Sequence, residues 1–354
     1  MTDLLELTAS LVDIASPSFA EGPLVDRLEA ELRAVPGLAV DRVGDNLVAR
    51  TALGRPTRVI VAGHTDTVPA NGNERARIDG DVLWGVGSAD MKGGLAVMLE
   101  LARTVTGPAV DVTWVFYARE EVAAVHNGLA ELFATRPDLL VGDVALLGEP
   151  TSGAIEAGCQ GTLRVDVWLA GRRAHTARAW MGVNAVHRLG DVLAVLRAYE
   201  PRRPVIAGCE FHEGLQAVAV EGGVAGNVVP DAVRLTINHR FAPDRGVAEA
   251  EAHVREVLAP ALGPDDTVTL VDHAAAAWPA TEHPVVQALI ERNRLAVRAK
   301  LGWTDVARFA AAGIPAANFG PGDATVAHAP DERLERRDLE VVHAALLDLL
   351  TRPA

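Results

Sequence analysis

Two side chains that could bind a metal stand close together in the stretch GHTDTVPANG, where His64 and Asp66 follow the apolar run RVIVAG. Folding alone does not require an imidazole and a carboxylate at the end of a short apolar segment. In open α/β sheets, ligands bind at the carboxyl ends of the strands. The pair therefore predicts a functional site after this segment. The residues themselves leave open whether Asp66 is a ligand or a partner of the histidine.

Further acidic and imidazole side chains stand at the ends of other segments. Glu120 and Glu121 follow VTWVFYA, and Glu149 follows DVALLG. Asp90 precedes a helical segment in GVGSADMKGG, and His328 stands in GPGDATVAHAPDE. Taken singly, each has a structural interpretation, such as a helix cap for an aspartate or a satisfied side chain for a lone histidine. Their shared position at segment ends predicts that they converge on one rim.

The chemistry of this set favours a metal site. Carboxylates gathered at one rim repel one another and raise their own pKa values unless cations neutralise them. Imidazole and carboxylate together are ligands of zinc and its first-row neighbours, and one carboxylate can bridge two ions about 3.5–4 Å apart. Competing motifs are weaker, because GVGSADMKGG lacks the third glycine of a dinucleotide loop and no GxSxG occurs.

Apolar periodicity predicts the elements that must position these residues. Helical spacing covers 4–15, 21–35 and 93–105, and buried strands are expected at 58–63, 112–118 and 143–148. Strand and helix alternating in this way indicate an α/β fold with a helix-covered, largely parallel sheet.

The pattern changes from residue 161. Strand, helix, strand, strand, helix and strand are expected in turn at 162–170, 184–198, 216–223, 233–241, 246–262 and 267–271. This β-α-β-β-α-β order is that of a ferredoxin-like α+β domain. After this region, the alternation of helix and buried strand resumes, with a helix expected at 283–299, a strand at 314–319 and a helix at 334–350. We therefore predict one domain formed by residues 1–160 and 271–354, with residues 161–270 inserted into it.

Composition restricts the possible partners. The 354 residues are 49% hydrophobic, which is enough for a sizeable core, and the net charge of -14 disfavours nucleic acid and anionic membranes. The sequence lacks an 18-residue apolar stretch, and MTDLLELTAS lacks the features of a leader peptide, so a cytoplasmic protein with no membrane partner is expected. Two cysteines cannot build a disulfide framework. Small molecules are the expected ligands.

Several motifs occur together and in one order over nearly the whole chain: GHTDTVP, GVGSADMKGG, the Glu120–Glu121 pair, LGEPT, AHTARAWMGVNAVH and AHAPDE. In that combination the sequence resembles the di-zinc aminoacylase/carboxypeptidase family of metallopeptidases. The resemblance implies two Zn²⁺ per chain, for which Co²⁺ can substitute. It also implies that the larger domain is catalytic and that the inserted domain is a lid through which a homodimer forms.

The resemblance further assigns roles to single positions. It makes Asp90 the carboxylate that bridges the ions, with the other ligands divided between the two as His64 and Glu149 on one and Glu121 and His328 on the other. Glu120 would be the catalytic base. Asp66 would accept the ring N–H of His64 that points away from the metal. His175 would stabilise the oxyanion from the partner subunit.

The substrate is also implied by resemblance. EEVAAVHNGL, LGEPTSGAIEAGCQG, GWTDVARF and FGPGDATVAHAPDE are most similar to the actinobacterial branch that removes succinate from N-succinyl-L,L-diaminopimelate during lysine biosynthesis. Asn227 and Arg240 match positions that hold substrate carboxylates. Arg178 and Trp303 occupy substrate positions where other branches carry an aromatic residue and a small hydroxyl residue.

Three alternatives remain open at this point. Acetylornithine deacetylases and the dipeptidases or aminoacylases of the family share the same metal ligands. A non-catalytic metal- or ligand-binding protein of the same fold is a third, different class. Glu120 argues against this last alternative, because a binding site has no use for a base beside its ligands.

Overall fold

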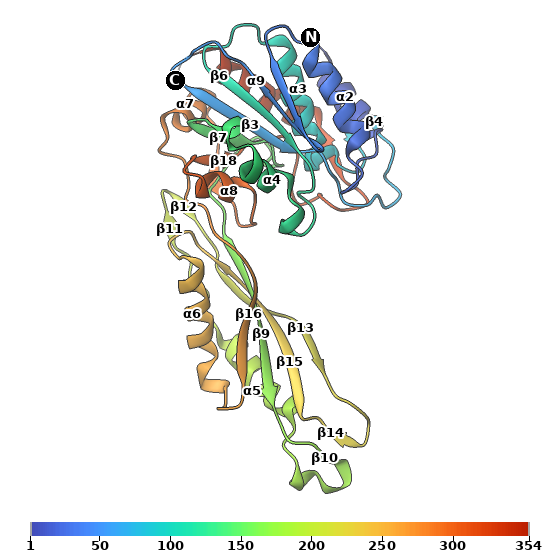
Figure 1. The fold of residues 1–354 in the computed structure, drawn as a ribbon, viewed down its shortest axis with the longest axis vertical. Helices are drawn as coiled ribbons and strands as arrows, with labels where there is room; N and C mark the ends of the chain where they lie inside the picture. Colours follow the sequence, from blue (N-terminus) through green and yellow to red (C-terminus); the bar gives the residue numbers. More distant parts are fainter. Residues whose placement is uncertain (1, 353–354) are drawn as a thin grey trace. The chain divides into compact units, whose positions relative to one another are not determined.

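The structure is a computed structural model that describes residues 2–352. The chain divides into two compact units (Figure 1). The first, here called the α/β unit, comprises the residues up to Gly158, Pro279–Arg298 and the residues from Asp305 onward. The inserted unit comprises Cys159–Trp278 and Ala299–Thr304. Residues 271–278 and 299–304 belong to the inserted unit, whereas the sequence pattern assigned them to the larger domain.

An eight-stranded sheet forms the centre of the α/β unit. Its four middle strands are parallel, since β3 pairs in parallel with β6 and β7, and β7 with β18. Antiparallel pairs flank them at β1–β2, β2–β6 and β8–β18. The predicted fold class is therefore confirmed. The strand order is β1 (Ala39–Val43), β2 (Asn46–Arg50), β6 (Asp111–Tyr117), β3 (Arg58–His64), β7 (Val144–Leu147), β18 (Ala316–Asn318), β8 (Ile155–Ala157) and β17 (Val297–Ala299).

Helices cover both faces of this sheet, so its middle strands are almost wholly buried. Every residue of β6 and β7 is buried, as expected of strands enclosed on two sides. In Figure 1, α3 and α9 lie behind the sheet, and α4 and α8 lie in front of it. The helices of this unit are α1 (Leu4–Val12), α2 (Gly22–Arg33), α3 (Gly93–Thr104), α4 (Gly128–Thr135), α7 (Pro284–Asn293), α8 (Val306–Ala311) and α9 (Arg336–Thr351).

One predicted helix is too long. The sequence pattern favoured a helix over 283–299, but α7 ends at Asn293 and residues 297–299 form strand β17. Arg294 adopts a left-handed conformation, with φ 54° and ψ 43°, which closes the helix. The apolar spacing continues through AVRA, so periodicity alone did not reveal the stop.

A small three-stranded sheet joins distant parts of the α/β unit. It consists of β19 (Arg333–Glu335), β5 (Val82–Trp84) and β4 (Arg77–Asp79), in that order. Strand β19 pairs antiparallel with β5. The segment that follows His328 is therefore fixed beside the segment that leads to Asp90.

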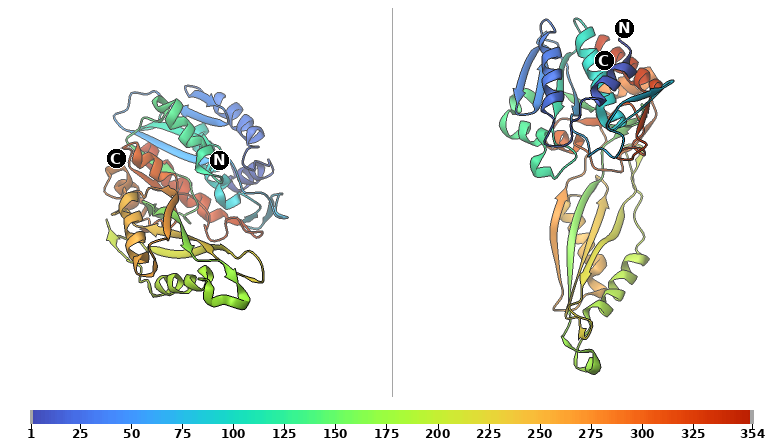
Figure 2. Two further views of the ribbon diagram at one scale, coloured as in Figure 1. Left: turned by 60° about the horizontal axis from the view of Figure 1, so that its bottom comes forward. Right: turned by 90° about the vertical axis from the view of Figure 1, so that its right-hand side faces the viewer.

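The inserted unit has the predicted ferredoxin-like topology. Its antiparallel sheet has the order β13-β15-β9-β16, and α5 and α6 lie along one face of it (Figure 2). Burial alternates along β9 and β15, because one face packs on the helices and the other meets solvent. The elements are β9 (Gly161–Ala170), α5 (Ala185–Ala198), β13 (Gly214–Gly222), β15 (Ala232–Phe241), α6 (Val247–Leu258) and β16 (Thr267–Ala274).

No helix within residues 2–352 has the length and apolar character needed to cross a lipid bilayer.

Candidate active site

The ends of neighbouring parallel strands bring several predicted site residues to one edge of the sheet. His64 is the last residue of β3. Glu120 and Glu121 follow β6, and Glu149 follows β7. Both β6 and β7 pair with β3 in parallel, so the chain leaves all three strands at the same edge.

Asp90 lies between two histidines. It belongs to η1 (Ser88–Lys92), a short turn directly before α3. Its Oδ1 is 3.0 Å from His64 Nε2, and its Oδ2 is 3.4 Å from His328 Nε2. The two oxygen atoms of one carboxylate therefore face two different imidazoles.

Glu121 completes the group of potential metal ligands. Its Oε1 is 2.8 Å from His328 Nε2. One ligand atom from each of His64, Asp90 and Glu121 lies within 4.8 Å of the others, close enough to share an ion. Glu149 is buried but lies outside this group of three. Nitrogen and carboxylate donors of this kind suit zinc and its neighbours.

The Asp66 carboxylate holds the turn that carries the two glutamates. It accepts the backbone N–H of Glu120 at 2.9 Å, that of Glu121 at 3.0 Å, and the Ser18 hydroxyl at 2.7 Å. The backbone carbonyl of Asp66, at 2.9 Å, faces His64 Nδ1, whereas its carboxylate Oδ1 is 3.6 Å away. Because a carbonyl only accepts hydrogen bonds, it places the proton of His64 on Nδ1. This leaves Nε2 free to act as a ligand.

Electrostatics keep this cluster charged. Burial alone would raise the pKa of Asp90, but hydrogen bonds from His328 and His64 hold it well below its usual value. Hydrogen bonds to Asp90 and Glu121 raise the pKa of His328 to about 10. Burial opposes protonation of His64, yet the carboxylates of Asp66 and Asp90 raise its pKa well above the ordinary value. Imidazoles and carboxylates therefore stabilise each other's charged forms in this cluster, and a bound cation would compete with the protons of the imidazoles.

Glu120 is placed differently from Glu121. Burial raises the pKa of the Glu120 carboxyl well above its usual range. The neighbouring carboxylates of Glu149, Asp305 and Glu121 raise it further, and His64 opposes them. A dication bound at the adjacent cluster would also favour the charged form of Glu120.

The structure divides the predicted residues of the inserted unit into two sets. His175 ends β10 (Ala174–His175), which pairs with β14 (Val228–Val229), and the Asn227 carbonyl accepts the N–H of Thr176. Arg178 follows within η4 (Thr176–Met181). These residues lie near the first residues of β15, since Gly171 N–H binds the carbonyl of Asp231.

Arg240 and Trp303 form the second set, at the other end of β15. Arg240 is the residue before Phe241, and it stands opposite Thr162 on β9. The Trp303 indole donates to the carbonyl of Ala275, just beyond the end of β16. Ten residues at about 3.3 Å each give β15 a length of roughly 30 Å. A small substrate cannot span both sets within one inserted unit.

Sequence reasoning missed several residues that support this cluster. Ser18 binds Asp66, as described above. Asp305, within GWTD, is buried and accepts hydrogen bonds from Asn127 at 2.9 Å and Arg308 at 2.5 Å. Glu332, four residues after His328, accepts backbone N–H groups beside Asp90. Asp305 and Glu332 stood within quoted motifs, so their position was a signal, but their partners could not be read from the sequence.

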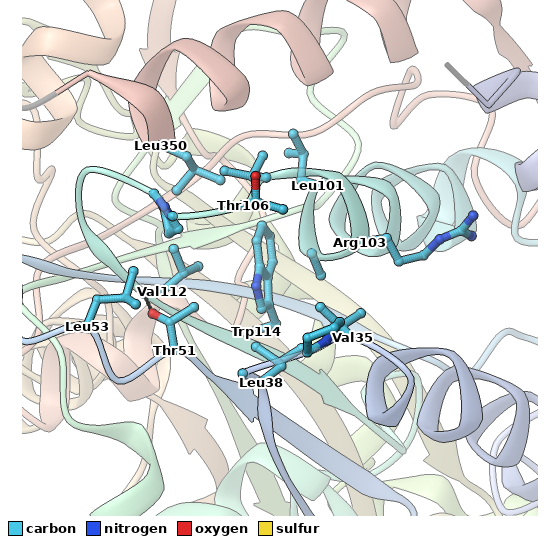
Figure 3. Close-up of a pocket in the computed structure, with 16 residues that line it drawn as sticks. Val35, Leu38, Thr51, Leu53, Leu101, Arg103, Thr106, Val112, Trp114 and Leu350 are labelled. Carbon is cyan, nitrogen blue, oxygen red and sulfur yellow. Dashed lines mark hydrogen bonds between the residues drawn. The ribbon is translucent and has the colours of Figure 1, made fainter.

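A pocket of the α/β unit lies away from this cluster. A cavity of about 200 Å³ opens near Val112 at the start of β6, whereas the site lies beyond the end of that strand (Figure 3). Figure 3 shows Trp114, Leu101 and Leu350 around it. Its one charged lining residue, Arg103, pairs with Glu31 at 2.8 Å. This lining has no acid or base available for catalysis.

The chain belongs to peptidase family M20/M25/M40, which it matches over residues 60–352. This confirms the family that its motifs suggested. Enzymes of this family depend on metal ions, and the chain is a metallohydrolase acting on amide bonds.

Individual relatives agree with this class. The chain is 52% identical to the DapE protein of Mycobacterium tuberculosis, over 99% of this chain and 97% of that protein. It is 44% identical to the succinyl-diaminopimelate desuccinylase of Corynebacterium glutamicum, covering 99% and 96% of the two chains.

Solved structures share the fold at lower identity. A tripeptidase from Staphylococcus aureus has a TM-score of 0.81 and 21% identity, covering 98% of this chain and 97% of that chain. The Bacillus subtilis YXEP protein, a dinuclear metal-binding peptidase, has a TM-score of 0.70 and 15% identity, covering 98% and 96%. At these identities the likeness establishes the architecture alone.

Proposed function

We propose that the protein is a two-metal amide hydrolase that removes succinate from N-succinyl-L,L-diaminopimelate. The observation that carries the proposal is the position of Asp90, whose two carboxylate oxygens face different histidines. A carboxylate placed in this way suits a bridge between two ions. The name of the Corynebacterium glutamicum relative, at 44% identity, supports the choice of substrate.

The donor set fits two zinc ions, for which Co²⁺ can substitute. His64 and Glu149 would hold one ion, Glu121 and His328 the other, and Asp90 both. The tautomer fixed by the Asp66 carbonyl supports His64 as a ligand, because it leaves the lone pair on Nε2. When bound, such ions lower the pKa of a water molecule towards neutrality and polarise the amide carbonyl.

Glu120 is the proposed catalytic base. It directly precedes the ligand Glu121, and the Asp66 carboxylate fixes the backbone of both residues. This holds the Glu120 carboxyl beside the cluster. Glu120 would take a proton from the attacking water and then deliver it to the departing amine.

The inserted unit would recognise the anionic substrate. Arg240 is half-buried, burial lowers its pKa, and within residues 2–352 no ion pair neutralises it. A desolvated guanidinium of this kind is suited to a substrate carboxylate. Asn227, Arg178 and Trp303 are the other proposed substrate contacts.

The separation of the two sets along β15 supports a dimer. If His175 and Arg240 serve the same small substrate, they must come from different subunits. Strand β13 is an edge of its sheet and exposes Val218 and Val220. Exposed apolar edge strands pair readily across a two-fold axis. We infer a homodimer through the inserted units, in which His175 stabilises the oxyanion at the partner's site.

A hydrolysis panel tests the proposed function. The zinc-loaded protein would be offered N-succinyl-L,L-diaminopimelate, N-acetylornithine and simple dipeptides, and release of amine would be measured. We expect the succinylated substrate to have the highest kcat/KM. A preference for acetylornithine or for dipeptides would mean that the protein has another activity of the same family. Hydrolysis of none of these substrates would favour a binding role.

A further inference from the structure

We propose that Glu332 is a positioning residue that sets the geometry and the metal affinity of the cluster around Asp90. The inference rests on the proposed metal centre, but it concerns a residue that has no assigned role there. Glu332 is buried, with 1% of its surface exposed. Its side chain faces backbone groups of the Asp90 turn and would not contact the ions.

The side chain of Glu332 fixes the turn that carries Asp90. Its Oε1 accepts the N–H of Ala89 at 3.0 Å and the N–H of Asp90 at 3.1 Å. A backbone N–H group that is shielded from water is unfavourable without an acceptor, whether that acceptor is charged or neutral. Both bonds hold the backbone directly at the proposed bridging ligand, so they restrict the direction in which its carboxylate points.

The backbone of Glu332 is tied to the same region. Its carbonyl accepts the N–H of Gly85 at 3.1 Å, and its N–H donates to the carbonyl of Ala329 at 3.1 Å. Ala329 is the neighbour of His328. One residue therefore links the turn of Asp90 with the loop of His328, although 238 positions separate residues 90 and 328 in the chain.

The position of His328 makes this link important. Its backbone is left-handed, with φ 63°, a conformation that is unfavourable for a residue with a side chain. Such a conformation persists where surrounding contacts determine it. The contacts of Glu332 and the β19–β5 pairing begin four and five residues later. We infer that they hold His328 within reach of Asp90.

Three substitutions at this position separate hydrogen bonding from packing. Glu332→Met keeps much of the volume and removes the acceptor. Glu332→Gln keeps an oxygen that can accept the same two N–H groups, and Glu332→Asp keeps the charge on a shorter arm. Asp331→Ala, which removes an exposed carboxylate from the same loop, is the matched control.

The measurements are zinc affinity, by competition with a chromophoric chelator, and the visible absorption of the Co²⁺-loaded protein. We expect Glu332→Met to bind zinc about 10–100-fold more weakly, the usual effect of replacing a residue that supports a metal ligand. The Co²⁺ absorption bands should also shift. Glu332→Gln should retain most of the affinity, and Asp331→Ala should match the wild type. Thermal unfolding of each metal-free variant reports whether it folds.

Two results would overturn the inference. One is wild-type zinc affinity with unchanged Co²⁺ bands in Glu332→Met. The other is a loss in Glu332→Gln as large as in Glu332→Met, because charge and not the acceptor would then be responsible. If Glu332→Met does not fold, Glu332→Asp decides between the same outcomes, since it must also lengthen both bonds. No substrate is used, so failure of the hydrolysis panel is a separate result.

Discussion

At the scale of single residues, the site consists of carboxylates with different partners and therefore different tasks. Asp66 accepts three donors and fixes a turn, whereas Asp90 faces two imidazoles. Glu121 contacts His328, while burial and nearby carboxylates raise the pKa of its neighbour Glu120. Adjacent glutamates can thus serve as a ligand and as a base.

Replacement of Glu120 by glutamine tests the proposed base. Glutamine keeps the size of the side chain and cannot accept the proton, so turnover should fall by at least ~10² to 10⁴, the usual contribution of general acid-base catalysis. Metal content should stay at the wild-type level. Glu335→Gln, an exposed change on β19, is the control. Near-wild-type turnover in Glu120→Gln would mean that the base is another group.

Replacement of His328 tests a proposed ligand. His328→Ala removes a direct donor, so we expect about one ion fewer per chain and a matching loss of activity. Elemental analysis after dialysis measures the content. His187→Ala, an exposed histidine on α5, should retain the wild-type content. An unchanged metal content in His328→Ala would remove it from the ligand set.

The sequence indicated the members of this cluster but not its contacts. Residue type and a place at the end of a strand or beside a helix were enough to select His64, Asp90 and Glu121, which the structure brings together. The partners of Asp66 could not be predicted, because they depend on a turn in which Arg119 has φ 62°. Glu332 lies 242 positions from Asp90, and only the folded chain brings it there.

At the scale of elements, the spacing of apolar residues correctly predicted the strands whose burial follows the same pattern. Strands β3, β6 and β7 are nearly wholly buried, and the alternation along β9 and β15 matches one covered face. The hairpin β1–β2 was not predicted. The predicted end of this helix, at residue 299, was wrong, because the left-handed residue Arg294 ends α7 although the apolar spacing continues.

The core between the helices and the sheet of the inserted unit gives a stability prediction. Leu258 of α6 is fully buried there. Leu258→Ala should lower the free energy of unfolding by about 2–5 kcal/mol, since it removes apolar contacts and leaves a cavity. Leu301 is 44% exposed, so Leu301→Ala should change the free energy of unfolding by about 0.5 kcal/mol or less. Denaturant unfolding measures both, and equal effects would contradict the described core.

At the scale of the whole molecule, the proposed dimer would bring residues of two chains to one substrate. His175 and Arg240 stand near opposite ends of one long strand, so one inserted unit cannot apply both to the same small substrate. The family and the ferredoxin-like topology were predictable from the sequence. This separation became visible only when β10 and β14 were placed.

Mixing two inactive variants tests this requirement. Homodimers of His175→Ala and of Glu120→Gln should each be nearly inactive. After subunit exchange, a heterodimer should regain about one working site, because only there do an intact base and an intact partner histidine meet. Recovery is measured as amide hydrolysis, with heterodimers verified by differential tags. Proven heterodimers without activity would mean that His175 acts within its own chain or not at all.

The central claim is that two ions act together across Asp90, and stepwise metal reconstitution tests it most directly. Metal-free protein would receive increasing Zn²⁺, with bound metal and hydrolysis of N-succinyl-L,L-diaminopimelate measured at each step. Five proposed ligands that include one bridging carboxylate exceed the needs of a single four-coordinate zinc, so activity should reach its maximum at about two ions per chain. Full activity with one bound ion per chain would contradict the bridging role of Asp90 and the two-metal mechanism.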